Sequence, residues 1–190
     1  LRALLVRSCG KLPLRPLTRQ PVVSPPTMAF NENTRVKLPA ILHLCRLGYA
    51  YLPLSKAKWE ADTNIFTDIF LDSVGKLNPG LSPADIKKAL DDVKLTLDNE
   101  DLGQAFYKLL TASSGVKLFD FNDPSRNSYH VVTELTYKNG EDEFRPDITL
   151  LFNGMPLVFI EVKKPNNQEG VLAERDRINS RFKNTKFRRF

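Results

Sequence analysis

The chain has 190 residues, of which 42% are hydrophobic and 26% are charged, and its formal net charge is +6. This composition is typical of a soluble globular protein with one core, and no apolar run approaches the roughly 20 residues of a membrane-spanning helix. Cysteines occur only at Cys9 and Cys45, which suits a protein of the reducing cytoplasm better than a disulfide-stapled secreted module. The histidines, His43 and His130, have no zinc-ligand spacing with each other or with the cysteines.

The positive charge is concentrated at the two ends of the chain. Residues 1–31 carry five basic residues and no acid, residues 32–169 carry 16 basic and 20 acidic residues, and residues 170–190 carry seven basic and two acidic residues. The body is therefore not a general basic nucleic-acid binder. The C-terminal stretch has two interpretations: DNA phosphates contact Arg175, Arg181 and Lys183, or these residues form the solvated face of a helix.

Residues 1–28 do not have the pattern of a folded domain, because five prolines interrupt any helical or strand period. This acid-free segment has three interpretations: translated upstream sequence or a start assigned too early, a targeting segment, or a disordered arm. We prefer the first, because Met28-Ala29-Phe30 would make a natural start. We therefore place one domain at residues 29–190, and we expect the chain to be a fragment of a longer protein.

Four helices are predicted in the first part of the domain. One runs from Thr34 to Leu47 and ends at Gly48, and Asn64 is predicted to cap a second that stops before Asn78. Ser82 followed by Pro83 predicts the start of a third helix, and a fourth begins near Asp101. The residues predicted to face the core are Ile65, Phe66, Ile69, Phe70 and Val74, then Ile86, Ala89, Leu90, Val93 and Leu97, then Leu102, Ala105, Phe106, Leu109 and Leu110.

Beyond Gly115 the hydrophobic period changes from helical to alternating. Strands are predicted at residues 116–121 and 129–137, followed by a turn at residues 138–141 that leads into the strand carrying Asp147. A last helix is predicted from Gln168 to Phe182, with Val171, Leu172, Ile178 and Phe182 facing inward. Helices, an antiparallel meander and a further helix together predict an α/β fold, in which a helical N-terminal part packs on a mixed, mainly antiparallel sheet.

The most informative segment lies between Arg145 and Asn166, where two apolar strands are joined by Asn153-Gly154. Asp147 and Glu161 stand near the outer ends of these strands. In a strict two-residue hairpin Asp147 would face Ile160, and Glu161 would point to the other side of the sheet. The two carboxylates come side by side only if a three-residue turn or a β-bulge moves the register by one residue, and we expect such a shift.

Two adjacent carboxylates repel each other, and a hard divalent cation relieves that repulsion. Asp147, Glu161 and the backbone carbonyl of Val162 would offer oxygen ligands suited to Mg²⁺. Lys163 would share a face with Glu161 and hold or deprotonate the attacking water in phosphodiester hydrolysis, whereas Lys164 would point away. A structural salt bridge between Glu161 and Lys163 is the alternative interpretation.

Two further acids are weaker candidates for this site. Glu100 stands at the start of the fourth predicted helix, where an acid equally serves to complement the helix dipole. Glu134 lies in the middle of the predicted strand at residues 129–137.

Pro146-Asp147 followed by Glu161-Val162-Lys163 resembles the PD-(D/E)xK nuclease motif. The longer run from Phe144 to Asn166 resembles the nuclease region of type I restriction enzyme R subunits, and the resemblance extends from about Leu38 to Phe190. It implies a restriction-endonuclease-like fold and a Mg²⁺-dependent type I site-specific deoxyribonuclease acting on double-stranded DNA. It also implies that Asp147, Glu161 and Lys163 are catalytic.

The resemblance further implies methyltransferase and specificity subunits as partners, and an ATP-driven DNA motor in the same protein. These residues contain neither a Gly-x-x-x-x-Gly-Lys-Ser/Thr phosphate loop nor the Gln-x-x-x-Tyr motif that often follows Glu-x-Lys in this family. We therefore expect ATP to bind only outside this chain. Two alternatives remain: a stand-alone PD-(D/E)xK nuclease acting on branched or recombining DNA, and a catalytically silent module that docks partner subunits.

Overall fold

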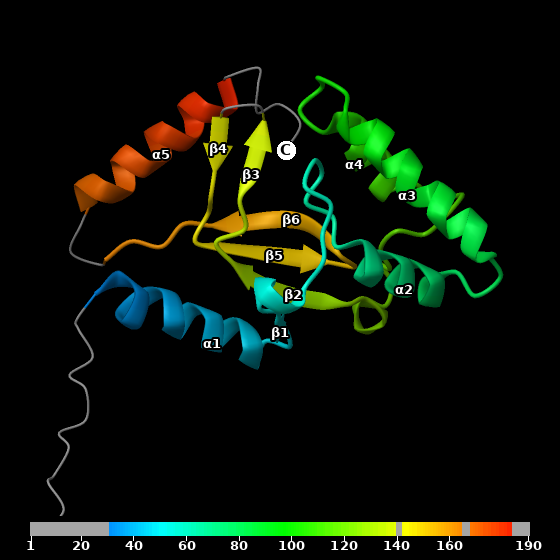
Figure 1. Ribbon diagram of the computed structural model, residues 1–190, viewed down its shortest axis with the longest axis horizontal. Helices are drawn as coiled ribbons and strands as arrows, with labels where there is room; N and C mark the ends of the chain where they lie inside the picture. Colours follow the sequence, from blue (N-terminus) through cyan, green and yellow to red (C-terminus); the bar gives the residue numbers. More distant parts are fainter. Residues whose placement is uncertain (1–30, 140–141, 165–167, 184–190) are drawn as a thin grey trace, which may run out of the picture.

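The computed structural model describes residues 31–139, 142–164 and 168–183, which form an α/β fold (Figure 1). A four-stranded sheet has the order β1-β2-β5-β6, with β1 at Ala50–Tyr51, β2 at Tyr129–Thr133, β5 at Ile148–Phe152 and β6 at Met155–Ile160. β1 is parallel to β2, and the other neighbouring strands are antiparallel. The predicted mixed, mainly antiparallel sheet is therefore confirmed.

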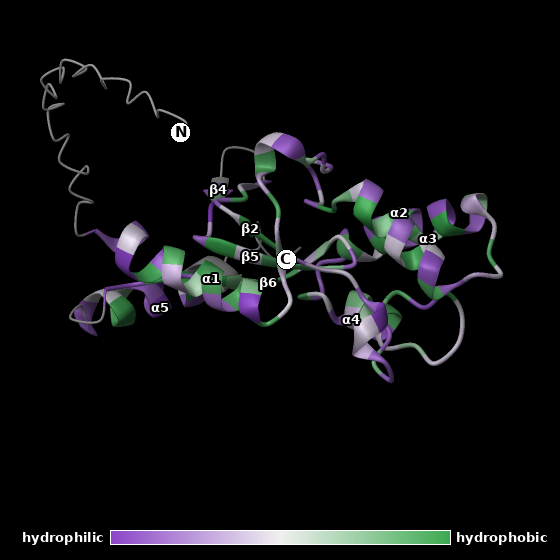
Figure 2. Cartoon of the chain, turned by 90° about the horizontal axis from the view of Figure 1, so that it is seen from below, coloured by the Kyte–Doolittle hydropathy of each residue, from purple (hydrophilic) through white to green (hydrophobic). Residues whose placement is uncertain are grey.

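Helices gather at the two ends of this sheet (Figures 1 and 2). The π-helix η1 (Asn33–Lys37) continues into α1 (Leu38–Arg46), and α5 (Gln168–Lys183) lies at the same end. At the other end are α2 (Thr67–Leu77), α3 (Pro83–Leu97) and α4 (Gln104–Leu110). Short 3-10 turns occupy Leu54–Lys56 and Pro124–Arg126, and among the described residues no helix is long and apolar enough to cross a membrane.

Strand β5 is buried on both faces, as its continuous apolar sequence predicts. Ile148 and Leu150 pack with residues of η1 and α1, among them Val36 and Ile41. The alternate residue Leu151 packs on the opposite face with Phe66 at the start of α2. Because side chains alternate along a strand, Asp147 belongs to the face opposite α1.

Several predicted helix boundaries are confirmed. Gly48 follows α1 with a φ of +102°, and Ser82 begins α3 through a capping box with Asp85. Asn64 is not the cap of α2: it is buried with a φ of +54°, and the cap is Phe66. The Phe66 N–H donates to the Gly154 carbonyl at 2.9 Å, which places the start of α2 two residues later than predicted.

Leu102 was also predicted wrongly as a core residue. Leu102 and Gly103 both have positive φ, so α4 begins only at Gln104 and Leu102 remains 63% exposed. The side chain of Asp101 accepts a hydrogen bond from the Ala105 N–H at 2.8 Å, which is the capping role of an acid at a helix start.

The strand predicted at residues 116–121 does not form. The Asn78 side chain bonds to both the N–H and the carbonyl of Lys117, and the Asn127 side chain accepts from the Asp120 N–H at 2.8 Å. Asparagine side chains thus satisfy backbone groups that a neighbouring strand would otherwise occupy.

The strand predicted at residues 129–137 is divided in two. Glu134 has a φ of +57° and ends β2, and β3 (Tyr137–Asn139) then pairs with β4 (Asp142–Phe144) in a separate two-stranded sheet. Residues 140–141 of the predicted turn lie outside the described residues, as do residues 1–28 of the predicted extension.

Helix α5 forms where it was predicted, and Ile178 is half-buried as predicted. The prediction was wrong for Val171 and Leu172, which are each 52% exposed, and Glu174 is half-buried instead. These two half-buried residues are four positions apart and share one side of the helix, so α5 turns an acid toward the rest of the domain. The side chain of Phe182 lies outside the described residues.

Candidate active site

The turn between β5 and β6 packs against α2 at Gly154 and is bonded to Ser128 and Leu118 through Asn153. Asn153 and Gly154 both have positive φ, and a Cβ on Gly154 would come within 2.7 Å of the Phe66 carbonyl oxygen and the Phe70 nitrogen. The buried Asn153 carboxamide accepts from the Ser128 N–H at 2.7 Å and donates to the Leu118 carbonyl at 2.9 Å. The near end of the hairpin is therefore fixed as a tight two-residue turn.

A β-bulge then shifts the register farther along the hairpin. Leu151 pairs with Pro156, but Leu150 pairs with Val158, so Leu157 is the extra residue in β6. Beyond the bulge Ile148 pairs with Ile160. The next residues outward, Asp147 and Glu161, consequently lie opposite each other, and the predicted register shift is confirmed.

Both carboxylate oxygens of Asp147 face a donor. Oδ2 accepts a hydrogen bond from the Val162 N–H at 3.0 Å. Oδ1 lies 3.6 Å from the Nζ of Lys37, which comes from the end of η1. The Asp147 side chain is thus oriented from two sides, while 27% of it remains exposed to solvent.

Glu161 is more deeply placed, with a side chain only 10% exposed. Burial raises the pKa of its carboxyl, and the negative charges of Asp147 and Glu174 raise it further, to about 7. Oε1 is buried and has no hydrogen-bond partner among the described groups. Two interacting carboxyls and one unpartnered oxygen leave a place for a cation.

Lys163 lies on the same side as Glu161, with its Nζ 3.7 Å from Glu161 Oε2. The same ammonium is 3.4 Å from Glu174 Oε2 on α5, and Glu174 also pairs with Arg177. Lys164 is exposed, as expected of a residue that points away. Glu174 was not predicted as a site residue, and nothing in the sequence distinguishes it from Glu169 and Asp176, the other acids of this helix.

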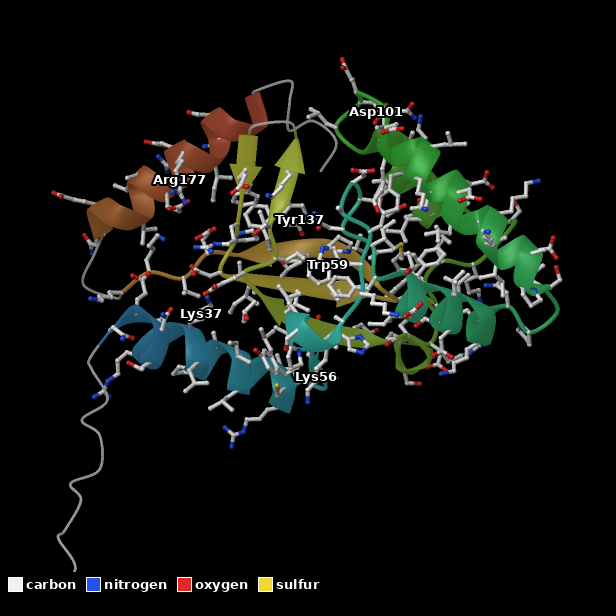
Figure 3. The ribbon with its side chains drawn as sticks, viewed as in Figure 1. Lys37, Lys56, Trp59, Asp101, Tyr137 and Arg177 are labelled. Carbon is white, nitrogen blue, oxygen red and sulfur yellow. The ribbon has the colours of Figure 1, made fainter. Side chains whose placement is uncertain are left out.

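Lys37 was also missed, and it is among the most buried charged residues described, at 6% exposure. Its Nζ lies 2.7 Å from Glu134 Oε1, and the lysine holds the pKa of the Glu134 carboxyl below its usual range. Glu134, predicted only as a weaker candidate, therefore reaches the site through Lys37. Figure 3 shows Lys37 and Arg177 on either side of the segment that follows β6.

Other predicted residues are not brought to this place. Glu100 is exposed in the connection between α3 and α4, and its neighbour Asp101 lies at the end of the molecule away from Lys37 (Figure 3). Arg175 is exposed and pairs with Asp176 at 3.2 Å. The side chains of Arg181 and Lys183 lie outside the described residues, so DNA contact by these three remains a prediction.

The residues fit a cation that keeps much of its water. Within the described ranges no three His, Cys, Asp or Glu side chains are gathered as a ready ligand set. Asp147 and Glu161 nevertheless supply two adjacent carboxylates, one of them with the unpartnered Oε1. Mg²⁺ is bound in this way by proteins, through one or two carboxylates and several waters.

A separate cavity of about 400 Å³ lies between β6, the α3–α4 connection and the β3–β4 pair. Its lining is mainly apolar, with Ile65, Phe106 and Phe159 among the contributing residues. It contains none of Asp147, Glu161 and Lys163, so its volume has no bearing on the chemistry of this site.

Fold and site together define an α/β domain with a carboxylate–lysine centre at the outer end of a β-hairpin. Residues 29–189 match the family described as type I restriction enzyme R protein N terminus, and the chain belongs to that family. No solved structure matches the chain significantly.

Curated relatives carry the same family name. The chain is 28% identical over 166 residues to a putative type I restriction enzyme MjaIXP endonuclease subunit of Methanocaldococcus jannaschii, covering 74% of this chain and 16% of the relative. It is 29% identical over 173 residues to the type I restriction enzyme HindI endonuclease subunit of Haemophilus influenzae, covering 76% and 16%. The chain thus spans 16% of the length of these two relatives.

Proposed function

We propose that this domain is the nuclease of a type I restriction enzyme, with a PD-(D/E)xK fold, and that it hydrolyses phosphodiesters of double-stranded DNA with Mg²⁺. The observation that carries the proposal is the bulge at Leu157, which brings Asp147 and Glu161 to opposing positions. An ordinary salt bridge at a strand end requires no such register shift. It also does not explain a glutamate with a pKa of about 7 beside a second carboxylate.

Asp147 and Glu161 would hold the Mg²⁺, together with the backbone carbonyl of Val162. When bound, the ion would stabilise negative charge on the scissile phosphate and acidify water. The Val162 N–H and Lys37 keep the Asp147 carboxylate in one orientation, so little reorganisation is needed when the cation arrives.

Lys163 would orient the attacking water and donate a hydrogen bond to the phosphate. Its ammonium lies between Glu161 and Glu174 with 25% of the side chain exposed, so it is both held in place and open to a ligand. Glu174 on α5 therefore positions Lys163 rather than contacting DNA itself.

The names of the relatives support the wider assignment. Both are named as endonuclease subunits of type I restriction enzymes, the first of them as a putative one, and we propose that this chain likewise works with methyltransferase and specificity subunits. ATP-driven translocation would belong to residues outside this chain.

The test is cleavage by the intact complex after single substitutions. Asp147→Ala, Glu161→Ala and Lys163→Ala should each abolish DNA cleavage while ATP hydrolysis persists. These residues act as one unit, so removing any one of them should cost about as much activity as removing all three. Lys164→Ala is the control and should retain most activity. Cleavage that survives Lys163→Ala but is lost in Lys164→Ala would contradict the proposed site, and retained cleavage in all four variants would favour the docking module.

A further inference from the structure

The Lys37 ammonium is enclosed by carboxylates from two other elements. Its Nζ lies 2.7 Å from Glu134 Oε1, just beyond β2, and 3.6 Å from Asp147 Oδ1, just before β5. Only 8% of the lysine side chain is exposed. A buried charge is costly unless it is paired, and here the pairing involves a residue of the candidate active site.

The backbone is distorted where Glu134 meets this lysine. Glu134 has a φ of +57°, a conformation that residues other than glycine rarely adopt, and its N–H donates to the Asp147 carbonyl at 3.3 Å. The turn ends β2 and directs the Glu134 carboxylate toward Lys37. Strain of this kind persists only where surrounding contacts impose it, and it is concentrated at functional sites.

Asp147 consequently has an acid on each side. Glu161 opposes it across the hairpin, where Glu161 Oε1 has no partner, and Glu134 stands on the side where Lys37 is placed. Two carboxylates facing a common point would themselves attract a divalent cation. Between Glu134 and Asp147, the Lys37 ammonium occupies the position that such a cation would take.

We propose that the Lys37 ammonium takes the place of a second divalent cation between Glu134 and Asp147. It thereby positions Asp147 and restricts Mg²⁺ to the side of Glu161. The inference rests on the proposed function, because it concerns the same Asp147. The competing interpretation is an ion pair that only fastens α1 to the sheet.

The number of Mn²⁺ ions bound by the 190-residue chain separates the two interpretations. It is obtained by titrating the protein with Mn²⁺ and measuring the free ion by electron paramagnetic resonance. Lys37→Met should bind one Mn²⁺ more than the wild type, because Glu134 and Asp147 are left without their cation. Lys37→Arg keeps the charge and should bind the wild-type number. The double variant Lys37→Met with Glu134→Gln should return to the wild-type number.

Lys94→Met is the matched control. Lys94 pairs with Glu60 at 2.8 Å, a distance similar to that between Lys37 and Glu134, but it lies on α3 and touches no residue of the site among the described contacts. Its loss leaves one isolated carboxylate and should add no bound ion.

Thermal unfolding covers the case in which Lys37→Met does not fold alone. Millimolar Mn²⁺ should then restore a cooperative transition, because a ligand of the folded state stabilises it by mass action.

Two results would overturn the inference. One is an unchanged Mn²⁺ count in folded Lys37→Met, and the other is a Lys37→Met protein that stays unfolded at saturating Mn²⁺ while the double variant folds. Failure of the proposed function appears differently, as a wild type that binds no Mn²⁺ and is unaffected by Asp147→Ala.

Discussion

The surroundings of Glu161 raise the pKa of its carboxyl to about 7. Its side chain is 10% exposed, and the carboxylates of Asp147 and Glu174 oppose its ionisation more than Lys163 favours it. Without a cation, Glu161 is therefore about half protonated near pH 7, and a divalent cation would favour the ionised form. Proton release and metal binding are expected to be coupled.

Stability should depend on pH through this residue. The pKa of Glu161 is about 7 in the folded protein, compared with an ordinary value of 4.5. The folded state therefore binds more protons between these values, and the contribution of Glu161 is complete below about pH 4.5 and lost as the pH rises to about 7. In EDTA, the thermal midpoint of the wild type relative to Glu161→Gln should fall across this window and then stay constant.

Saturating Mg²⁺ provides the control for this measurement. It should raise the midpoint of the wild type at pH 8 and leave Glu161→Gln much less affected. A difference between the two proteins that is constant from pH 4 to pH 8 in EDTA would contradict the raised pKa of Glu161.

At the residue scale the sequence predicted what lies on one hairpin. Asp147, Glu161 and Lys163 could be predicted as site residues from the Pro-Asp and Glu-x-Lys motifs within residues 144–166 and from the alternation of side chains along a strand. Lys37 and Glu174 were missed because they arrive from η1 and α5, and only tertiary packing shows that their side chains reach this hairpin. The chemistry of Glu134 was equally hidden, since its positive φ interrupts what looks like one continuous strand.

At the scale of elements, the β5–β6 hairpin connects the turn that packs on α2 to the carboxylates at its outer end. Its turn is packed against α2, its bulge sets the register, and its outer end carries the acids. The position of the bulge was not predictable, because a three-residue turn would have shifted the register equally well.

Gly154→Ala tests the fixed end of this hairpin. The added Cβ would lie 2.7 Å from backbone atoms of Phe66 and Phe70, at a residue with a φ of +83°. We expect the free energy of unfolding to fall by more than about 1 kcal/mol, measured by urea denaturation.

Gly80→Ala is the matched control for that substitution. A Cβ at Gly80 meets nothing within 4 Å, so its effect should stay within about 0.5 kcal/mol. Equal stability of the Gly154 and Gly80 variants would show that the close packing of the turn on α2 is not as described.

Local signals at this scale succeeded where backbone groups bond to near neighbours. The capping box at Ser82 and the end of α1 at Gly48 are both of this kind. The strand predicted at residues 116–121 does not form because the side chains of Asn78, 39 residues before Lys117, and Asn127, seven residues after Asp120, supply hydrogen-bond partners for its backbone. Alternation of apolar residues does not reveal such side-chain partners.

At the scale of the whole molecule, the packed turn of the β5–β6 hairpin and the candidate site lie at opposite ends of the sheet. Helices α2 to α4 pack around the turn of the β5–β6 hairpin, and α1 and α5 lie on either side of its outer end (Figure 1). The sequence predicted the α/β class and the succession of N-terminal helices, sheet and last helix, but it did not predict β1 or the division of residues 129–137 into β2 and β3. It did not predict that the first and last described helices meet at one site, since no local pattern encodes that arrangement.

The central claim is that a divalent cation binds between Asp147 and Glu161, and locating the ion tests it most directly. Crystals of the 190-residue chain grown with Mn²⁺ should give an anomalous difference peak within about 2.3 Å of an oxygen of each carboxylate. The peak should vanish in Asp147→Ala. A peak at other acids, with Asp147 and Glu161 left unbound under conditions that support Mn²⁺-dependent cleavage, would contradict the account.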